Sequence, residues 1–168
     1  WAYAAKTTAD DVMDVIGQLY QMNRATDIRT FRLSLSHLAI PAFNAAYGDV
    51  DGNLYYAFLS RTPIRATKFD WRSPVPGWTK ETNWGGILPF SQLPQVINPE
   101  ASFLQNCNTP PDAVTLSSSL EPTNFPPYLG WGTMNDRGRR ALVWLSSNPL
   151  VSVDDALAFS RDEYLLAA

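Results

Sequence analysis

The side chains that most often carry out chemistry in enzymes are scarce in this sequence of 168 residues, which holds one histidine, His37, and one cysteine, Cys107. A Ser–His–Asp triad within the chain would have to use His37, and no G-x-S-x-G turn is present to expose a nucleophilic serine. One cysteine forms no internal disulfide, and one histidine builds no histidine-rich metal site. The sequence therefore carries no self-contained triad or metal centre of a common kind.

The run QNCN at 105–108 leads into a segment whose amino acids are typical of a turn. Asn108 precedes Thr109 and two prolines, and asparagine in such a turn often bonds its own backbone. Cys107 lies between two asparagines with no histidine partner in sight, which favours an inert, buried thiol. His37 falls on a predicted helix, where an exposed or already bonded imidazole is the common case. Residue type alone assigns none of these side chains to catalysis.

Composition places the chain among globular domains. Charged residues make up 17% and aromatic residues 12%, a profile that excludes intrinsic disorder and argues against a long coiled coil. The net charge of −3 leaves no basic footprint for nucleic acid or anionic lipid, so neither is expected as a partner. No apolar run approaches the roughly 20 residues of a membrane-spanning helix. The length fits one domain of about 100–200 residues.

Two helices are predicted in the first part of the chain, and they would help to position any site. The spacing of apolar residues predicts one helix over 8–23, with Thr8 or Asp10 as its N-cap, and a second over 27–38, with Thr26 as its N-cap. Each helix carries its apolar residues on one face, which must pack against another element.

A β-hairpin is the clearest strand signal. Strands are predicted over 42–47 and 54–59, on either side of an Asp-Gly turn. The second strand is apolar throughout, which indicates that both of its faces are covered. The following segment, 62–100, is rich in proline and glycine and holds three tryptophans, so we expect irregular structure there.

The last third of the chain returns to regular structure. We predict a short strand over 102–107, then helices over 133–146 and 153–166, with Ser152 and Asp155 as a capping box at the second helix. With helices at both ends and a small sheet between them, the predicted fold class is α+β.

Several stretches, taken in order, resemble motifs of the β chain of the penicillin acylase family, which is a group of N-terminal-nucleophile hydrolases. The order and spacing of these stretches carry the resemblance, since each alone is weak. They are NAAYGDVDGNL (44–54), SRTPIR (60–65), PVPG (74–77), WGGILPF (84–90), LPQVINP (93–99), QNCN (105–108) and NDR (135–137).

The resemblance implies part of an αββα sandwich, with 1–168 as a single partial domain of an acylase β chain. It also implies cleavage of N-acyl amides such as penicillins or acyl-homoserine lactones, by an N-terminal serine whose α-amine acts as the base. The sequence begins with Trp1, which has no nucleophilic side chain, so we expect the nucleophile to lie outside these residues. Implied partners are the acylase α chain and the remainder of the β chain, in the periplasm or outside the cell.

The family motifs also suggest site residues. Asn108 corresponds to the oxyanion-hole asparagine of the family, and Arg137 to an arginine that orients this asparagine. A surface arginine among basic neighbours remains the alternative for Arg137. Asn44 and Asn106 are expected to hold the hairpin and the strand end. No cofactor is implied; calcium occurs in the family, but its ligands do not map onto this sequence, so no metal ligand is assigned.

Two alternatives remain open. A binding module for carbohydrate would use Trp71, Trp78 and Trp84 as stacking surfaces, although packing of these rings under the long loop is the simpler interpretation. A degenerate family member would keep the scaffold without catalysis.

Overall fold

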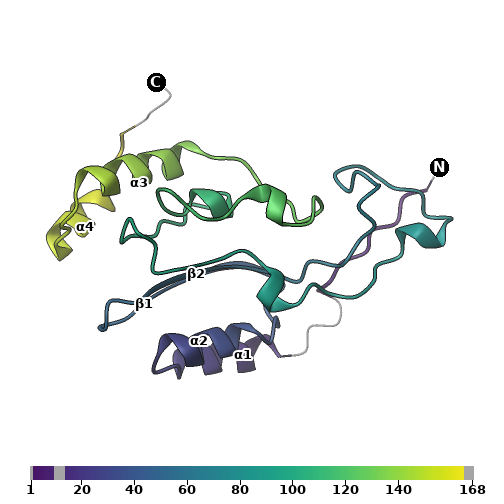
Figure 1. Cartoon of the computed structure of the whole chain (residues 1–168), viewed down its shortest axis with the longest axis horizontal. Helices are drawn as coiled ribbons and strands as arrows, with labels where there is room; N and C mark the ends of the chain where they lie inside the picture. The colour runs from purple at the N-terminus through teal and green to yellow at the C-terminus, as the bar shows by residue number, and fades with distance from the viewer. Residues whose placement is uncertain (1, 10–13, 165–168) are drawn as a thin grey trace.

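The computed structural model describes residues 2–9 and 14–164, and these residues form the predicted α+β arrangement (Figure 1). Three antiparallel strands pair in the order β1-β2-β3. The elements are α1 (Val15–Asn23), α2 (Ile28–Leu35), β1 (Ala42–Gly48), β2 (Leu54–Ser60), η1 (Lys80–Thr82), η2 (Phe90–Gln92), β3 (Gln95–Ile97), η3 (Pro111–Ala113), η4 (Pro122–Asn124), α3 (Asp136–Ser147) and α4 (Val153–Phe159).

The sheet separates two layers. In Figure 1, α1 and α2 lie on one side of β1 and β2, whereas α3, α4 and the segment between β3 and α3 lie on the other. The central strand β2 is covered on both faces, as the sequence predicts, because Tyr55, Tyr56 and Ala57 are fully buried. Among the described residues β1 pairs only with β2, so its outer edge is open. No helix in this part of the chain is both long and apolar enough to cross a bilayer.

The predicted hairpin is confirmed, and Asp49 holds its turn. The Asp49 carboxylate accepts hydrogen bonds from the Tyr47 hydroxyl (3.0 Å), from the Asn53 backbone amide (2.9 Å) and from the Asn53 side chain. These bonds stabilise the charged form and keep the pKa of Asp49 below its ordinary value, with the Asn53 side chain as the largest cause. Gly52 supplies the positive φ that the turn requires (83°).

Both N-terminal helices are shorter than predicted. The first begins at Val15, because the Asp14 carboxylate accepts from the Gly17 backbone amide at 2.8 Å and caps the helix there. The prediction of Thr8 as the cap was wrong, and Asp10 lies outside the described residues. The second helix is capped by Asp27 rather than Thr26, through a capping box with Thr30.

The strand predicted over 102–107 does not form. Positive φ angles at Ser102 (57°) and Asn108 (58°) turn the chain at both ends, and the backbone amide of Gln105 bonds to the Val114 carbonyl instead of a strand. The third strand is Gln95–Ile97, which pairs with β2 although prolines flank it. The rest of 62–100 is irregular apart from two short 3-10 helices, as predicted.

The two C-terminal helices are present with different ends from those predicted. The capping box of Ser152 and Asp155 is confirmed at the start of α4, but this helix ends at Phe159; the end predicted at 166 lies outside the described residues. The rings of Trp144 and Phe159 stack at 4.2 Å and join α3 to α4.

Candidate active site

A buried glutamine shapes the loop that carries the candidate site. The Gln105 side chain is 6% exposed; its Nε2 donates to the Thr109 hydroxyl at 2.9 Å, and its Oε1 accepts from the Cys107 backbone amide at 3.1 Å. Both ends of this carboxamide are thus used inside one loop. The loop is therefore held from its inner side, while Asn108 remains on its outer side.

Asn108 is exposed and adopts a left-handed backbone conformation, which asparagine tolerates better than most residues. Its Oδ1 accepts a hydrogen bond from Arg137 Nη2 at 3.1 Å. Since the oxygen is taken by the guanidinium, the Nδ2 group points away from Arg137 and has no acceptor among the described residues. The carboxamide is therefore oriented with its donor end free.

Arg137 and Asn135 bring the start of α3 onto the same loop. Arg137 Nη2 also donates to the Cys107 carbonyl at 3.1 Å, and Asn135 Nδ2 donates to that carbonyl at 2.8 Å. Asn135 is at the same time the N-cap of α3, accepting from the Gly138 backbone amide at 2.9 Å. A longer bond of 3.5 Å runs from Asn135 Nδ2 to the Asn108 carbonyl, so four side-chain hydrogen bonds from the helix start converge on Cys107 and Asn108.

Gly138 permits this close approach. A Cβ atom built at this position would lie 2.2 Å from Thr109 Cγ2 and 3.1 Å from Met134 Sδ, distances at which one group must move. Any larger residue would therefore require Thr109 or the start of α3 to move.

Three asparagines line one cavity of about 310 Å³ between β1, β2 and this loop. Asn44 Nδ2 donates to Asn106 Oδ1 at 3.0 Å, and the same oxygen accepts from the Asn108 backbone amide at 3.3 Å. Asn44 therefore bonds the loop rather than the hairpin backbone, contrary to expectation. The cavity lining contains no charged side chain, and Arg137 is the cation beside it. Such a neutral, donor-rich site favours negative charge that develops during a reaction.

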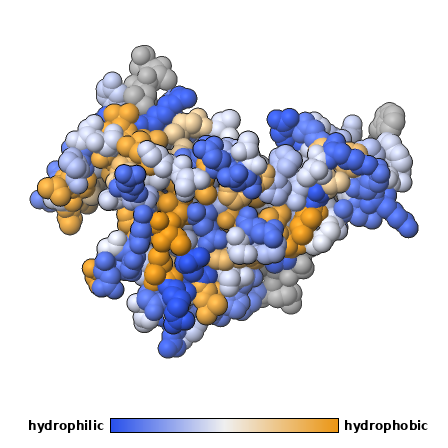
Figure 2. Space-filling model, viewed as in Figure 1, coloured by the Kyte–Doolittle hydropathy of each residue, from blue (hydrophilic) through white to orange (hydrophobic). Residues whose placement is uncertain are grey.

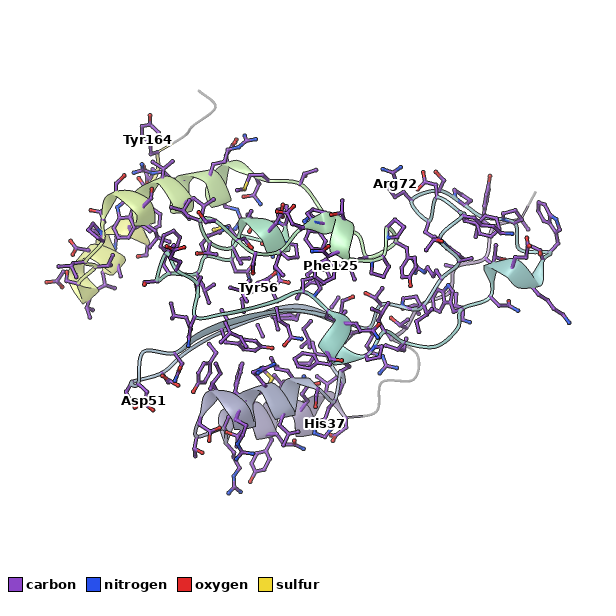
Figure 3. All side chains as sticks on the ribbon, viewed as in Figure 1. His37, Asp51, Tyr56, Arg72, Phe125 and Tyr164 are labelled. Atoms are coloured by element: carbon purple, nitrogen blue, oxygen red, sulfur yellow. The ribbon has the colours of Figure 1, made fainter. Side chains whose placement is uncertain are left out.

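The other candidates lie apart from this cavity. His37 is exposed just after α2, and Figure 3 places it across the sheet from α3. Cys107 is half-buried, and its backbone rather than its thiol contacts the site residues. Within the residues that the structure describes, no group of three histidine, cysteine or acidic side chains could hold a metal ion. Trp71 and Trp84 are half-buried against Arg65, and Trp78 is 81% exposed.

Comparison with known families matches residues 1–168 to the penicillin amidase family. The chain belongs to this family. It is 32% identical over 119 residues to penicillin acylase 2 proenzyme from Pseudomonas sp. (strain SE83), a match that covers 71% of this chain and 14% of the relative. It is also 41% identical over 77 residues to penicillin G acylase from Escherichia coli, covering 46% of this chain and 9% of that protein.

The fold agrees with that of a solved acylase. The thermostable penicillin G acylase from Alcaligenes faecalis superposes with a TM-score of 0.62 at 24% sequence identity, covering 86% of this chain and 25% of that chain. The chain thus spans a small part of the length of these relatives.

Sequence reasoning missed three residues that position the site in this penicillin amidase chain: Gln105, Asn135 and Gly138. Asn135 lies inside the predicted helix 133–146, whereas the observed helix begins at Asp136 with Asn135 as its N-cap. Asparagine is a preferred N-cap residue, so its position near the predicted start was the available signal. Gly138 lies inside a helical pattern, where a glycine often allows another segment to pack closely against the helix. Nothing in the sequence marks the buried bonds of Gln105, because its partners come from the folding of the loop.

Proposed function

We propose that this chain is part of an N-acyl amide hydrolase whose nucleophile, an N-terminal serine, lies in polypeptide outside these residues. Asn108 is the oxyanion donor in this proposal, and Arg137 is the residue that positions it. The observation that carries the proposal is the hydrogen bond from Arg137 to Asn108 Oδ1, because it leaves the Nδ2 group free to donate beside the cavity.

The proposed reaction makes use of that free donor. The serine Oγ attacks the amide carbonyl carbon while its proton passes to the α-amine of the same residue, and the carbonyl oxygen gains negative charge. Asn108 Nδ2 donates to this oxygen as the charge develops. The amine then leaves with a proton, and water hydrolyses the acyl-enzyme. A neutral donor suits this step because it stabilises the oxyanion without losing a proton of its own.

The rest of the acylase would cover the open side of the sheet. On β1, whose outer edge is open, the Phe43 side chain is 70% exposed. Phe43 and Asn44 also line a second, apolar cavity of about 350 Å³ against α1 and α2. Figure 2 shows apolar side chains on the viewed face at the level of the sheet, between the two helical layers. An open strand edge with exposed apolar groups is typical of a surface that another segment covers.

The name of one relative, a proenzyme, supports a processed precursor as the source of the missing serine. The acylase α chain and the remainder of the β chain are the proposed partners, and the periplasm or the cell exterior is the proposed location. The carbohydrate-binding alternative is less favoured, because Trp71 and Trp84 each present a face to Arg65.

The proposal is tested with the full-length protein that carries this chain. We expect it to hydrolyse chromogenic N-acyl amides, whereas the 168-residue chain alone is inactive. N-terminal sequencing of the processed β chain is expected to identify a serine, and replacing this serine by alanine should abolish turnover. A folded, processed full-length protein that hydrolyses no N-acyl amide would favour the degenerate homologue instead.

A further inference from the structure

Arg65 occupies an unusual position between two tryptophans in the segment that follows β2. Its guanidinium carbon lies 5.1 Å from the ring centroid of Trp71 and 5.1 Å from that of Trp84. The Trp71 ring is itself fixed, because its Nε1 donates to the Ala66 carbonyl at 2.8 Å. A guanidinium placed over an aromatic ring interacts with the face of the ring and can still donate hydrogen bonds from its N–H edges.

Those N–H groups lack a partner in the described part of the chain. Arg65 Nε is buried and has no hydrogen-bond acceptor, and Arg65 forms no ion pair there. Burial also lowers the pKa of the Arg65 guanidinium, which reflects the loss of water around its charge. A buried donor without an acceptor is unfavourable, so an acceptor that reached it would be bound favourably.

Arg65 lines a cavity of about 980 Å³ between this segment and residues 127–133, which include Tyr128 and Trp131. This volume lies at the upper end of the range of about 300–1,000 Å³ for small-molecule sites. Figure 3 labels Arg72, on the projecting segment that forms one wall. The Trp131 ring is fixed on the other wall, because its Nε1 donates to Asp112 Oδ1 at 2.8 Å.

The other cations at this cavity already have acidic partners. Arg72 pairs with Asp70 at 2.8 Å, and Lys68 pairs with Glu81 at 2.6 Å. Arg65 is therefore the cation at this cavity whose charge no carboxylate of the described residues meets. A ligand that supplied a carboxylate would fill that position.

We propose that this cavity binds a small organic carboxylate with an apolar body. The carboxylate would accept from the N–H edge of Arg65 in the plane of the guanidinium, the geometry in which arginine binds carboxylates through two hydrogen bonds. The apolar body would contact the aromatic rings of the walls, above all Trp71, Tyr128 and Trp131. The site is separate from the three asparagines, so it does not depend on amide hydrolysis.

Calorimetry on the full-length protein, with cyclohexanecarboxylate as the probe, tests the proposal. We expect saturable binding accompanied by a change in tryptophan fluorescence, since Trp71 and Trp84 flank Arg65. Cyclohexanecarboxamide, which has the same body without the charge, is expected to bind at least about 10-fold more weakly, because a hydrogen bond to a charged acceptor is stronger than one to a neutral acceptor. Inorganic phosphate is expected to bind more weakly as well, because it has no apolar body.

Two substitutions test whether the carboxylate binds at Arg65. Arg65→Lys keeps the charge but loses the paired N–H edge, so we expect binding about 10-fold weaker. The matched control is Arg72→Lys at the same cavity, where the side chain is 90% exposed and already paired; binding should change less than about twofold. Near-ultraviolet circular dichroism of the tryptophans checks the fold of each variant.

Several outcomes would overturn the proposal. These are no saturable binding of the carboxylate to the native protein, equal binding of the carboxamide, binding of phosphate as tight as that of the carboxylate, or unchanged binding in folded Arg65→Lys. Loss of binding in Asn108→Ala would place the carboxylate at the asparagine cavity and would also overturn it. Because the first three comparisons use the native protein, a variant that fails to fold leaves the test decisive.

Discussion

In the proposed reaction, replacing Asn108 in the full-length protein removes one oxyanion donor. Its side chain is exposed, so no cavity forms in the core, and Arg137 keeps its second acceptor, the Cys107 carbonyl. Loss of one oxyanion donor raises the barrier by about 3–4 kcal/mol, which lowers kcat about 10²–10³-fold. KM should change little, because the bond strengthens only as the oxygen becomes charged.

The backbone of Asn108 calls for two variants. Alanine at a φ of 58° costs roughly 1–2 kcal/mol of conformational strain, whereas glycine adopts this conformation freely. Asn108→Ala and Asn108→Gly should therefore lose the same turnover while differing in the free energy of unfolding. Asn83→Ala, at an exposed asparagine outside the cavity lining, is the matched control and should keep the activity of the wild type.

The assay measures steady-state release of the chromogenic amine by the processed full-length enzyme. Arg137→Met should lower kcat by itself but add nothing in the Asn108→Ala background, because the proposal has Arg137 act on the reaction only through the carboxamide. A kcat within about threefold of the wild type in either Asn108 variant would refute the oxyanion role. Additive losses in the double variant would refute the positioning role of Arg137.

Two further predictions concern stability. Gly138→Ala should lower the free energy of unfolding by about 1–3 kcal/mol through the clash with Thr109 Cγ2, as measured by denaturant titration. Thr109→Ser should restore much of the loss, and Gly77→Ala, where a Cβ meets nothing, is the control; no rescue would mean that the clash is not the cause. Because the pKa of Asp49 is lowered from 3.8 in the folded state, its contribution is present above that pH and is lost as the pH falls through the folded value. Asp49→Asn should remove this acid-dependent part, and equal slopes of stability against pH for both proteins would contradict the assignment.

The features that could be predicted from the sequence are local ones. The hairpin around Gly52 and the capping box of Ser152 depend on residues within a few positions of each other, so their pattern is visible in the chain. Helix starts were less well predicted, because several acidic or hydroxyl residues compete for the cap near each start. The cap of α1 is Asp14, the polar side chain that reaches the Gly17 amide.

The candidate site could be predicted only in part. The family motif indicated Asn108 and Arg137, and the structure places their side chains in direct contact. The orientation of the carboxamide could not be predicted, since it depends on the approach of α3 across Gly138 to a loop held by Gln105. The strand Gln95–Ile97 was missed for a similar reason. It is only three residues long and lies between prolines, so its sequence gives no strand pattern, and it forms through its long-range pairing with β2.

The shared carbonyl of Cys107 has a mechanical consequence. Asn135 and Arg137 both donate hydrogen bonds to this one oxygen from the start of α3, so the helix start and the peptide between Cys107 and Asn108 are tied together. A substitution that shifted the start of α3 would therefore also displace Asn108, although the substituted residue need not contact it.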